Sequence, residues 1–205
     1  MSTINYFKKY SIYALLAVGI IFTGCKKDED TPAPENEVEV ITDVTLVFTN
    51  TADANDVVTA RAKDPDGEGV QELAILDEIN LGLGKTYTLT YEIFNNLETP
   101  GENIGDEIKE EDAEHQLFFS FTNNAFTDPT GNGNIDNASD PINYNDKDDN
   151  GNNVGLETTW TVRTTALTGG TFTVKLQHQP GVKTATSGAN YGDTDFNLTF
   201  KLNIK

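Results

Sequence analysis

The stretch DFNLTFKLNI at residues 195–204 alternates polar and apolar side chains without a break. This alternation is typical of a β-strand with one buried face, because successive side chains of a strand point to opposite faces of its sheet. The same period of two recurs at residues 44–49, 86–93 and 171–176. The sequence therefore predicts a domain built from half-buried strands.

Shorter or less regular strand patterns occupy residues 57–63, 72–76, 117–122 and 157–165, and clusters of Gly, Asn and Asp separate the segments. A set of about eight strands rich in Thr favours an all-β two-sheet sandwich over a barrel or an α/β fold. We expect an antiparallel two-sheet sandwich of the immunoglobulin-like kind. One short acidic helix is expected at residues 105–115, where Asp and Glu dominate.

Composition narrows the classes of function. The chain has 205 residues with 14 Lys and Arg against 33 Asp and Glu, a formal charge of −19. A polyanion of this strength repels nucleic acid, so DNA and RNA are excluded as partners. A single Cys excludes an internal disulfide framework and a Cys-based zinc ribbon, and two His leave little material for a His-rich metal site.

Residues 1–24 have the form of an export signal. Lys8 and Lys9 precede an apolar run at residues 10–22 that is too short to span a bilayer comfortably as a helix. The following residues, Phe22 to Cys25, resemble the lipobox of bacterial lipoproteins. That resemblance implies cleavage before Cys25 and acylation of its thiol, which would anchor the protein to a membrane. The alternative is an ordinary secretory signal with an incidental Cys.

A charged cluster follows the lipobox and resembles the export signal that sends lipoproteins of Bacteroidota to the outer face of the outer membrane. The alternative is a solvated charge cluster in a linker. The Pro-containing residues 31–36 are then expected to form an extended tether. The export signal would comprise Lys26, Lys27, Asp28, Glu29 and Asp30.

These features divide the chain into a signal peptide (1–24), an acylated Cys with export tag and linker (25–43), and a β-sandwich domain (44–205). As a whole the chain resembles small surface lipoproteins of Bacteroidota that carry one such domain. The resemblance implies an outer-membrane, cell-surface location and work beside an outer-membrane receptor or on an extracellular ligand. It rests on the leader and on the segments 64–67 (DPDG), 114–116 (EHQ), 178–180 (HQP) and 192–196 (GDTDF).

Residues 146–157 match the spacing of an EF-hand calcium loop, in which oxygen ligands surround a hard cation and Gly permits a sharp turn. The flanks indicate loop and strand, so we expect a calcium loop inserted between strands, or else a flexible Asp/Asn/Gly loop. The matching positions are Asp146, Asp148, Asn150, Gly151 and Glu157, and Asn152 is a further expected ligand.

A second carboxylate cluster, Asp64, Asp66 and Glu68, lies on a Pro/Gly turn and predicts either a second calcium loop or a plain hairpin turn. The connection at residues 123–153 is too long for an idle hairpin turn. We expect it to be ordered by a cation, to bind a ligand, or to be disordered.

His115 and His178 each lie at the end of an expected strand. If the two strand ends meet, the imidazoles and a carboxylate would form half of a transition-metal site. Otherwise they are hydrogen-bonded structural residues. Trp160 is expected in the core, the alternative being a sugar-stacking platform with Tyr144 or Tyr191.

No nucleophile motif or phosphate-binding Gly loop is present, so we expect a protein that is not an enzyme. The leading hypothesis is a cell-surface binding lipoprotein whose acidic loops are ordered by calcium. One alternative is an accessory of an outer-membrane receptor that captures a metal ion or small ligand with His115 and His178. The other is an adhesion or structural surface protein.

Overall fold

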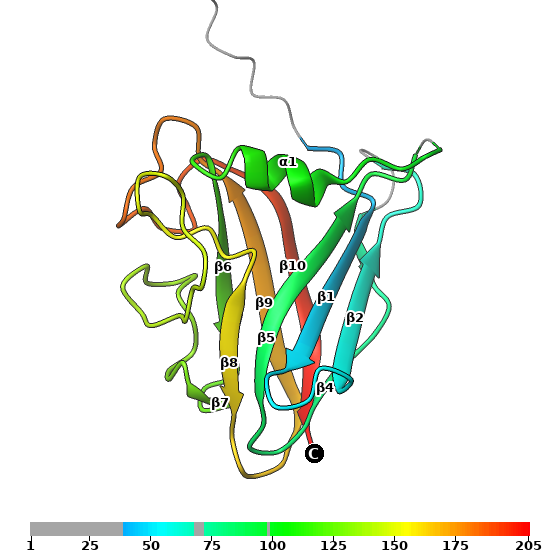
Figure 1. The fold of residues 1–205 in the computed structure, drawn as a ribbon, viewed down its shortest axis with the longest axis vertical. Helices are drawn as coiled ribbons and strands as arrows, with labels where there is room; N and C mark the ends of the chain where they lie inside the picture. The colour runs from blue at the N-terminus through cyan, green and yellow to red at the C-terminus, as the bar shows by residue number, and fades with distance from the viewer. Residues whose placement is uncertain (1–38, 68–71, 98) are drawn as a thin grey trace, which may run out of the picture. The chain divides into compact units, whose positions relative to one another are not determined.

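The computed structural model describes residues 39–67, 72–97 and 99–205, which form an all-β sandwich of two sheets with one short helix (Figure 1). Every segment that the sequence predicted as a strand contains one. The elements are β1 (Asp43–Asn50), β2 (Val57–Lys63), β3 (Ala74–Ile75), β4 (Ile79–Leu81), β5 (Thr86–Phe94), α1 (Ile104–Glu110), β6 (His115–Phe121), β7 (Phe126–Asp128), β8 (Thr158–Val162), β9 (Leu167–His178) and β10 (Asp193–Ile204).

One sheet has the strand order β3-β2-β1-β5-β8-β7 and the other the order β4-β10-β9-β6. Neighbouring strands of the described residues pair antiparallel except β4 and β10, which run parallel. The sequence analysis missed β4 and β7, because three residues are too few for a period of two to stand out.

The apolar residues of β10 behave as their alternation predicts: Phe196, Leu198, Phe200, Leu202 and Ile204 are all buried between the sheets. In chain order β10 follows β9, and the two strands pair over almost their full lengths. This hairpin forms the centre of the four-stranded sheet.

Trp160 of β8 lies at the centre of an aromatic cluster in the core. Its ring centroid is 5.2 Å from that of Phe119, 4.9 Å from that of Phe126 and 5.0 Å from that of Phe172. Its side chain is fully buried, and its indole N–H donates to Thr158 Oγ1 at 2.7 Å. Trp160 is therefore a core residue, as expected, and not part of a sugar-stacking surface.

Helix α1 is shorter than the predicted segment 105–115. It ends at Glu110, and the chain turns before His115 begins β6. The helix lies across one end of the sandwich, where β5 ends and β6 begins (Figure 1). It buries Ile104 and Ile108 there, so α1 closes that end of the core.

The long connection between β7 and β8 packs along β6, the edge strand of its sheet. Asn134 brackets Phe119, accepting the Phe119 N–H at Oδ1 (2.9 Å) and donating its own backbone N–H to the Phe119 carbonyl (2.7 Å). The hydroxyl of Tyr144 donates to the Leu117 carbonyl at 2.7 Å. Gly133 approaches so closely that an added Cβ would lie 2.1 Å from the Phe119 carbonyl oxygen, and its φ is +98°. The connection covers an edge that would otherwise be open to other strands.

We predict that Trp160→Ala destabilises the domain by about 3–5 kcal/mol, because the cavity cannot collapse within a cluster of large rings. Urea unfolding monitored by circular dichroism measures the loss. Val57→Ala, at a side chain that is 45% exposed, is the control and should change stability by about 0.5 kcal/mol or less. A loss at Trp160 as small as that of the control would contradict the central position of this side chain.

Candidate functional site

The two histidines of the chain lie side by side at the end of the sandwich that carries α1. Because β6 begins at His115 and β9 ends at His178, the antiparallel register pairs these two residues directly. Their rings stack with centroids 4.5 Å apart and planes 5° from parallel. Both side chains are buried. The two strand ends therefore meet, which is the condition that the metal-binding alternative required.

One ring nitrogen of each histidine is available to bind a metal ion. Nδ1 of His115 lies 3.2 Å from the carbonyl oxygen of Glu111, which can only accept, so Nδ1 carries the proton and Nε2 presents a lone pair. That Nε2 is buried without a hydrogen-bond partner. Nε2 of His178 lies 3.4 Å from Glu114 Oε2, but the contact lacks hydrogen-bond geometry, so this nitrogen also has no hydrogen-bond partner.

Glu111 supplies a carboxylate to the pair. The three side chains of Glu111, His115 and His178 each place one ligand atom within 4.8 Å of the other two. Among the described residues, no other group of three His, Cys, Asp or Glu side chains does so. Since the two rings are nearly parallel, their lone pairs do not converge on one point. One imidazole must turn about its χ angles to bind the same ion as the other.

Several carboxylates surround this group and repel one another. Burial raises the pKa of Asp195 to about 7, and the nearby carboxylates of Glu39 and Asp193 add to the effect while His178 opposes it. Burial and the adjacent Glu102 and Glu39 likewise raise the pKa of Glu107 to about 7. The site is thus rich in negative charge that protons partly neutralise.

The surroundings keep His115 uncharged. Burial, together with the proximity of His178 and Lys183, lowers its pKa to about 4. A neutral imidazole is the form that binds metal ions. His115 is therefore ready to act as a ligand at neutral pH without first losing a proton.

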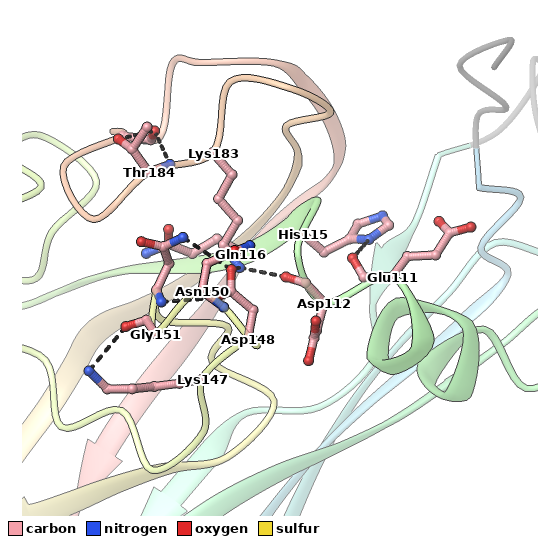
Figure 2. A network of polar contacts seen from close by, with 12 residues as sticks. Glu111, Asp112, His115, Gln116, Lys147, Asp148, Asn150, Gly151, Lys183 and Thr184 are labelled. Atoms are coloured by element: carbon pink, nitrogen blue, oxygen red, sulfur yellow. Dashed lines mark hydrogen bonds and ion pairs between the residues drawn. The ribbon is translucent and has the colours of Figure 1, made fainter. Parts of the chain in front are cut away.

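Lys183 joins three connections beside this site. Figure 2 shows its side chain reaching toward Asp148 and Asp112. The ammonium lies 3.2 Å from Asp148 Oδ2 and donates to the Asp112 carbonyl at 2.5 Å, and the Lys183 and Asp148 side chains are 1% and 0% exposed. Burial lowers the pKa of Lys183, although Asp148 opposes the shift. This buried ion pair ties the 179–192 and 143–157 connections to the turn after α1.

The predicted calcium loop is ordered through its own backbone. Asp148 Oδ1 accepts the N–H groups of Asn150 and Asn152 at 2.9 and 2.8 Å. Asp146 accepts from the N–H of Gly155 at 2.9 Å and from that of Glu157 at 3.2 Å. The side chain of Asn152 donates to Asp148, while Asn150 and Glu157 are exposed. The structure thus places backbone donors and Lys183 at the carboxylates that were expected to hold calcium, and calcium at this loop stays a prediction.

The turn at residues 64–67 is organised in a similar way. Asp64 is buried, and its Oδ1 accepts the N–H groups of Asp66 and Gly67, both at 3.1 Å. Asp66 is exposed, and Glu68 lies outside the described residues. Asp64 therefore stabilises a hairpin turn, and a second calcium loop here also stays a prediction.

Sequence reasoning found the two histidines but missed Glu111 and Asp195. The spacing of Glu111 and His115, four residues apart after an acidic helix, was a usable signal. Nothing in the sequence singled out Asp195. Cys25 and the expected export signal at residues 26–30 lie outside the described residues. Among the residues that the structure does describe, no helix is long and apolar enough to cross a membrane.

We predict that Lys183→Met destabilises the domain by about 3–5 kcal/mol, because it leaves the carboxylate of Asp148 buried without its counter-ion. Chemical unfolding measures the change. Lys147→Met is the matched control, since Lys147 is an exposed Lys in the same network whose ammonium donates to the Gly151 carbonyl at 3.3 Å, and it should cost about 0.5 kcal/mol or less. Equal losses in the two variants would contradict the importance of the buried pair.

We further predict that Asp195→Asn stabilises the metal-free protein more at pH 8 than at pH 5. The pKa of Asp195 in the folded protein, about 7, lies above its ordinary value of 3.8, so its stabilising contribution is complete below pH 3.8 and is lost as the pH rises through 7. The Asn variant lacks this pH dependence, and its free energy of unfolding at pH 8 should exceed that of wild type by at least about 1 kcal/mol. Urea unfolding in the presence of chelator at pH 5 and pH 8 tests this prediction. The same stability difference between variant and wild type at both pH values would refute it.

Comparisons with protein-family models, with curated proteins and with solved structures found no match for this chain.

Proposed function

We propose that this protein binds a divalent transition-metal ion through His115, His178 and Glu111. The observation that carries the proposal is the pair of buried Nε2 atoms without hydrogen-bond partners at the two histidines. Buried polar atoms are nearly always satisfied, so a pair of unpartnered nitrogens in one place needs a partner such as an ion. The ligand atoms of all three side chains already lie within 4.8 Å of one another.

The donor set favours zinc or copper(II) over calcium. Imidazole nitrogen suits zinc, copper and nickel, whereas calcium takes oxygen ligands alone. The carbonyl of Glu111 holds the Nδ1–H of His115, which fixes the tautomer and the ring as outer partners do in metal sites. Two neutral imidazoles and a carboxylate would leave an excess positive charge on the ion, and the surrounding carboxylates would balance it.

The proposed activity is capture of such an ion at the cell surface by a lipid-anchored protein. The anchor at Cys25 and the export signal after it remain predictions from the sequence. Metal capture was one of the two alternative functions in the sequence analysis, and the stacked histidines now favour it over a calcium-ordered binding module. It requires no catalytic chemistry of the protein.

Thermal unfolding of the purified protein, treated with chelator and then titrated with zinc, copper(II) or calcium, tests the proposal. A ligand that binds only the folded state stabilises it by about 2.7 kcal/mol at one hundred times its dissociation constant. For a domain of this size that is a rise of roughly 5–10 °C. We expect the rise with zinc or copper(II), and we expect His178→Ala to abolish it.

Glu111→Gln should weaken the zinc response, whereas Glu110→Gln, at the neighbouring exposed carboxylate, should leave it unchanged. A rise with calcium alone, lost in a variant that combines Asp146→Ala and Glu157→Ala, would overturn the proposal in favour of the acidic loop. No response to any of these ions would also refute it.

A further inference from the structure

Strand β10 contains a β-bulge directly beside the histidine pair. Thr194 pairs with Gln177 and Phe196 pairs with Leu176, so β10 carries one residue, Asp195, more than the facing segment of β9. An extra residue lets two consecutive side chains point to the same face of a sheet and re-aims them. Phe196 faces the core, and the hydroxyl of Thr194 bonds Gln177 on the other face. The bulge therefore places Asp195 on the inner face with Phe196.

The carboxylate of Asp195 is incompletely satisfied in this position. Its Oδ2 is buried and has no hydrogen-bond partner. Among the described residues only five buried side-chain oxygen or nitrogen atoms lack a partner, and three of them belong to His115, His178 and Asp195. Asp195 also interacts electrostatically with His178. Three unpartnered atoms gathered at one end of the sandwich indicate a shared partner.

We infer that Asp195 is a further ligand of the ion, an inference that rests on the proposed function. With it the site offers two imidazole nitrogens and two carboxylates, a set that completes four-coordinate zinc. Asp195 lies outside the group whose atoms are within 4.8 Å of one another. The ion therefore draws its short side chain inward by rotation about χ1 and χ2, at the same time as one imidazole turns.

The neighbouring glycine keeps this part of β10 close to the site. Gly192 has a φ of +78°, and an added Cβ would lie 2.0 Å from the carbonyl oxygen of His178. Only a residue without a side chain permits this approach. The close contact fixes the start of β10 against the end of β9, so the bulge and His178 keep their relative positions.

Affinity for zinc alone, measured on the whole purified protein by competition with a chromophoric chelator, tests the inference. Asp195→Asn should weaken zinc binding at least about tenfold. Asp53→Asn, at an exposed carboxylate in the turn between β1 and β2, should leave the affinity within twofold of wild type. Unfolding of each metal-free variant confirms that it is folded.

The visible spectrum of bound cobalt(II) separates a ligand from a side chain that acts at a distance, because its bands report the atoms bound to the ion. We expect Asp195→Asn to change these bands and Asp53→Asn to preserve them. If wild type binds zinc and Asp195→Asn matches it in affinity and in the cobalt spectrum, the inference about Asp195 is overturned while the proposed function stands. If wild type binds neither of these metals and also does not bind copper(II), the proposed function itself fails.

Discussion

The register between β6 and β9 is the constraint on which both the core and the candidate site depend. Seven residue pairs run from His115 with His178 to Phe121 with Phe172. At one end this pairing brings two imidazoles into contact, and at the other it places Phe119 and Phe172 around Trp160. A slip by one residue would turn every side chain of β6 to the opposite face. The packing of the aromatic core therefore specifies the geometry of the histidine pair.

Repulsion between carboxylates destabilises the end of the sandwich that carries the site. With 33 acidic and 14 basic side chains, the chain has few cations to offer. It uses Lys183 in a buried pair with Asp148, while the carboxylates near the histidines are left to repel one another. Protons relieve part of that repulsion, as the raised pKa values of Asp195 and Glu107 show. A divalent cation bound here would relieve the rest of the repulsion between these carboxylates.

The fold could largely be predicted from the sequence, because alternation depends only on which face of each strand is buried. Residues 195–204 and 44–49 carried that signal, whereas β4 and β7 were too short to show it. The site was harder. His115 and His178 were identified as strand ends, but their contact follows from a pairing between distant segments. Asp195 could not be found, since a bulge depends on two strands together and one sequence does not display it.

The predicted calcium loop shows why a spacing motif needs its surroundings. Residues 146–157 match the pattern in full, yet the pattern says nothing about a lysine thirty-five positions away. In the folded protein that lysine, Lys183, approaches Asp148, and backbone N–H groups donate to the carboxylates of Asp146 and Asp148. Asp, Asn and Gly favour such internally bonded loops with or without an ion.

The contact of Lys183 with the Asp112 carbonyl has a consequence for binding strength. The segment that follows His178 and the turn that follows Glu111 are joined by this contact before any ion arrives, and the Gln179 N–H adds a second link to the Glu114 carbonyl at 2.6 Å. Ligands from separate segments usually lose conformational freedom when an ion gathers them, and that loss lowers affinity. Here folding has already ordered these segments, so binding of the ion restricts only the rotation of the ligand side chains.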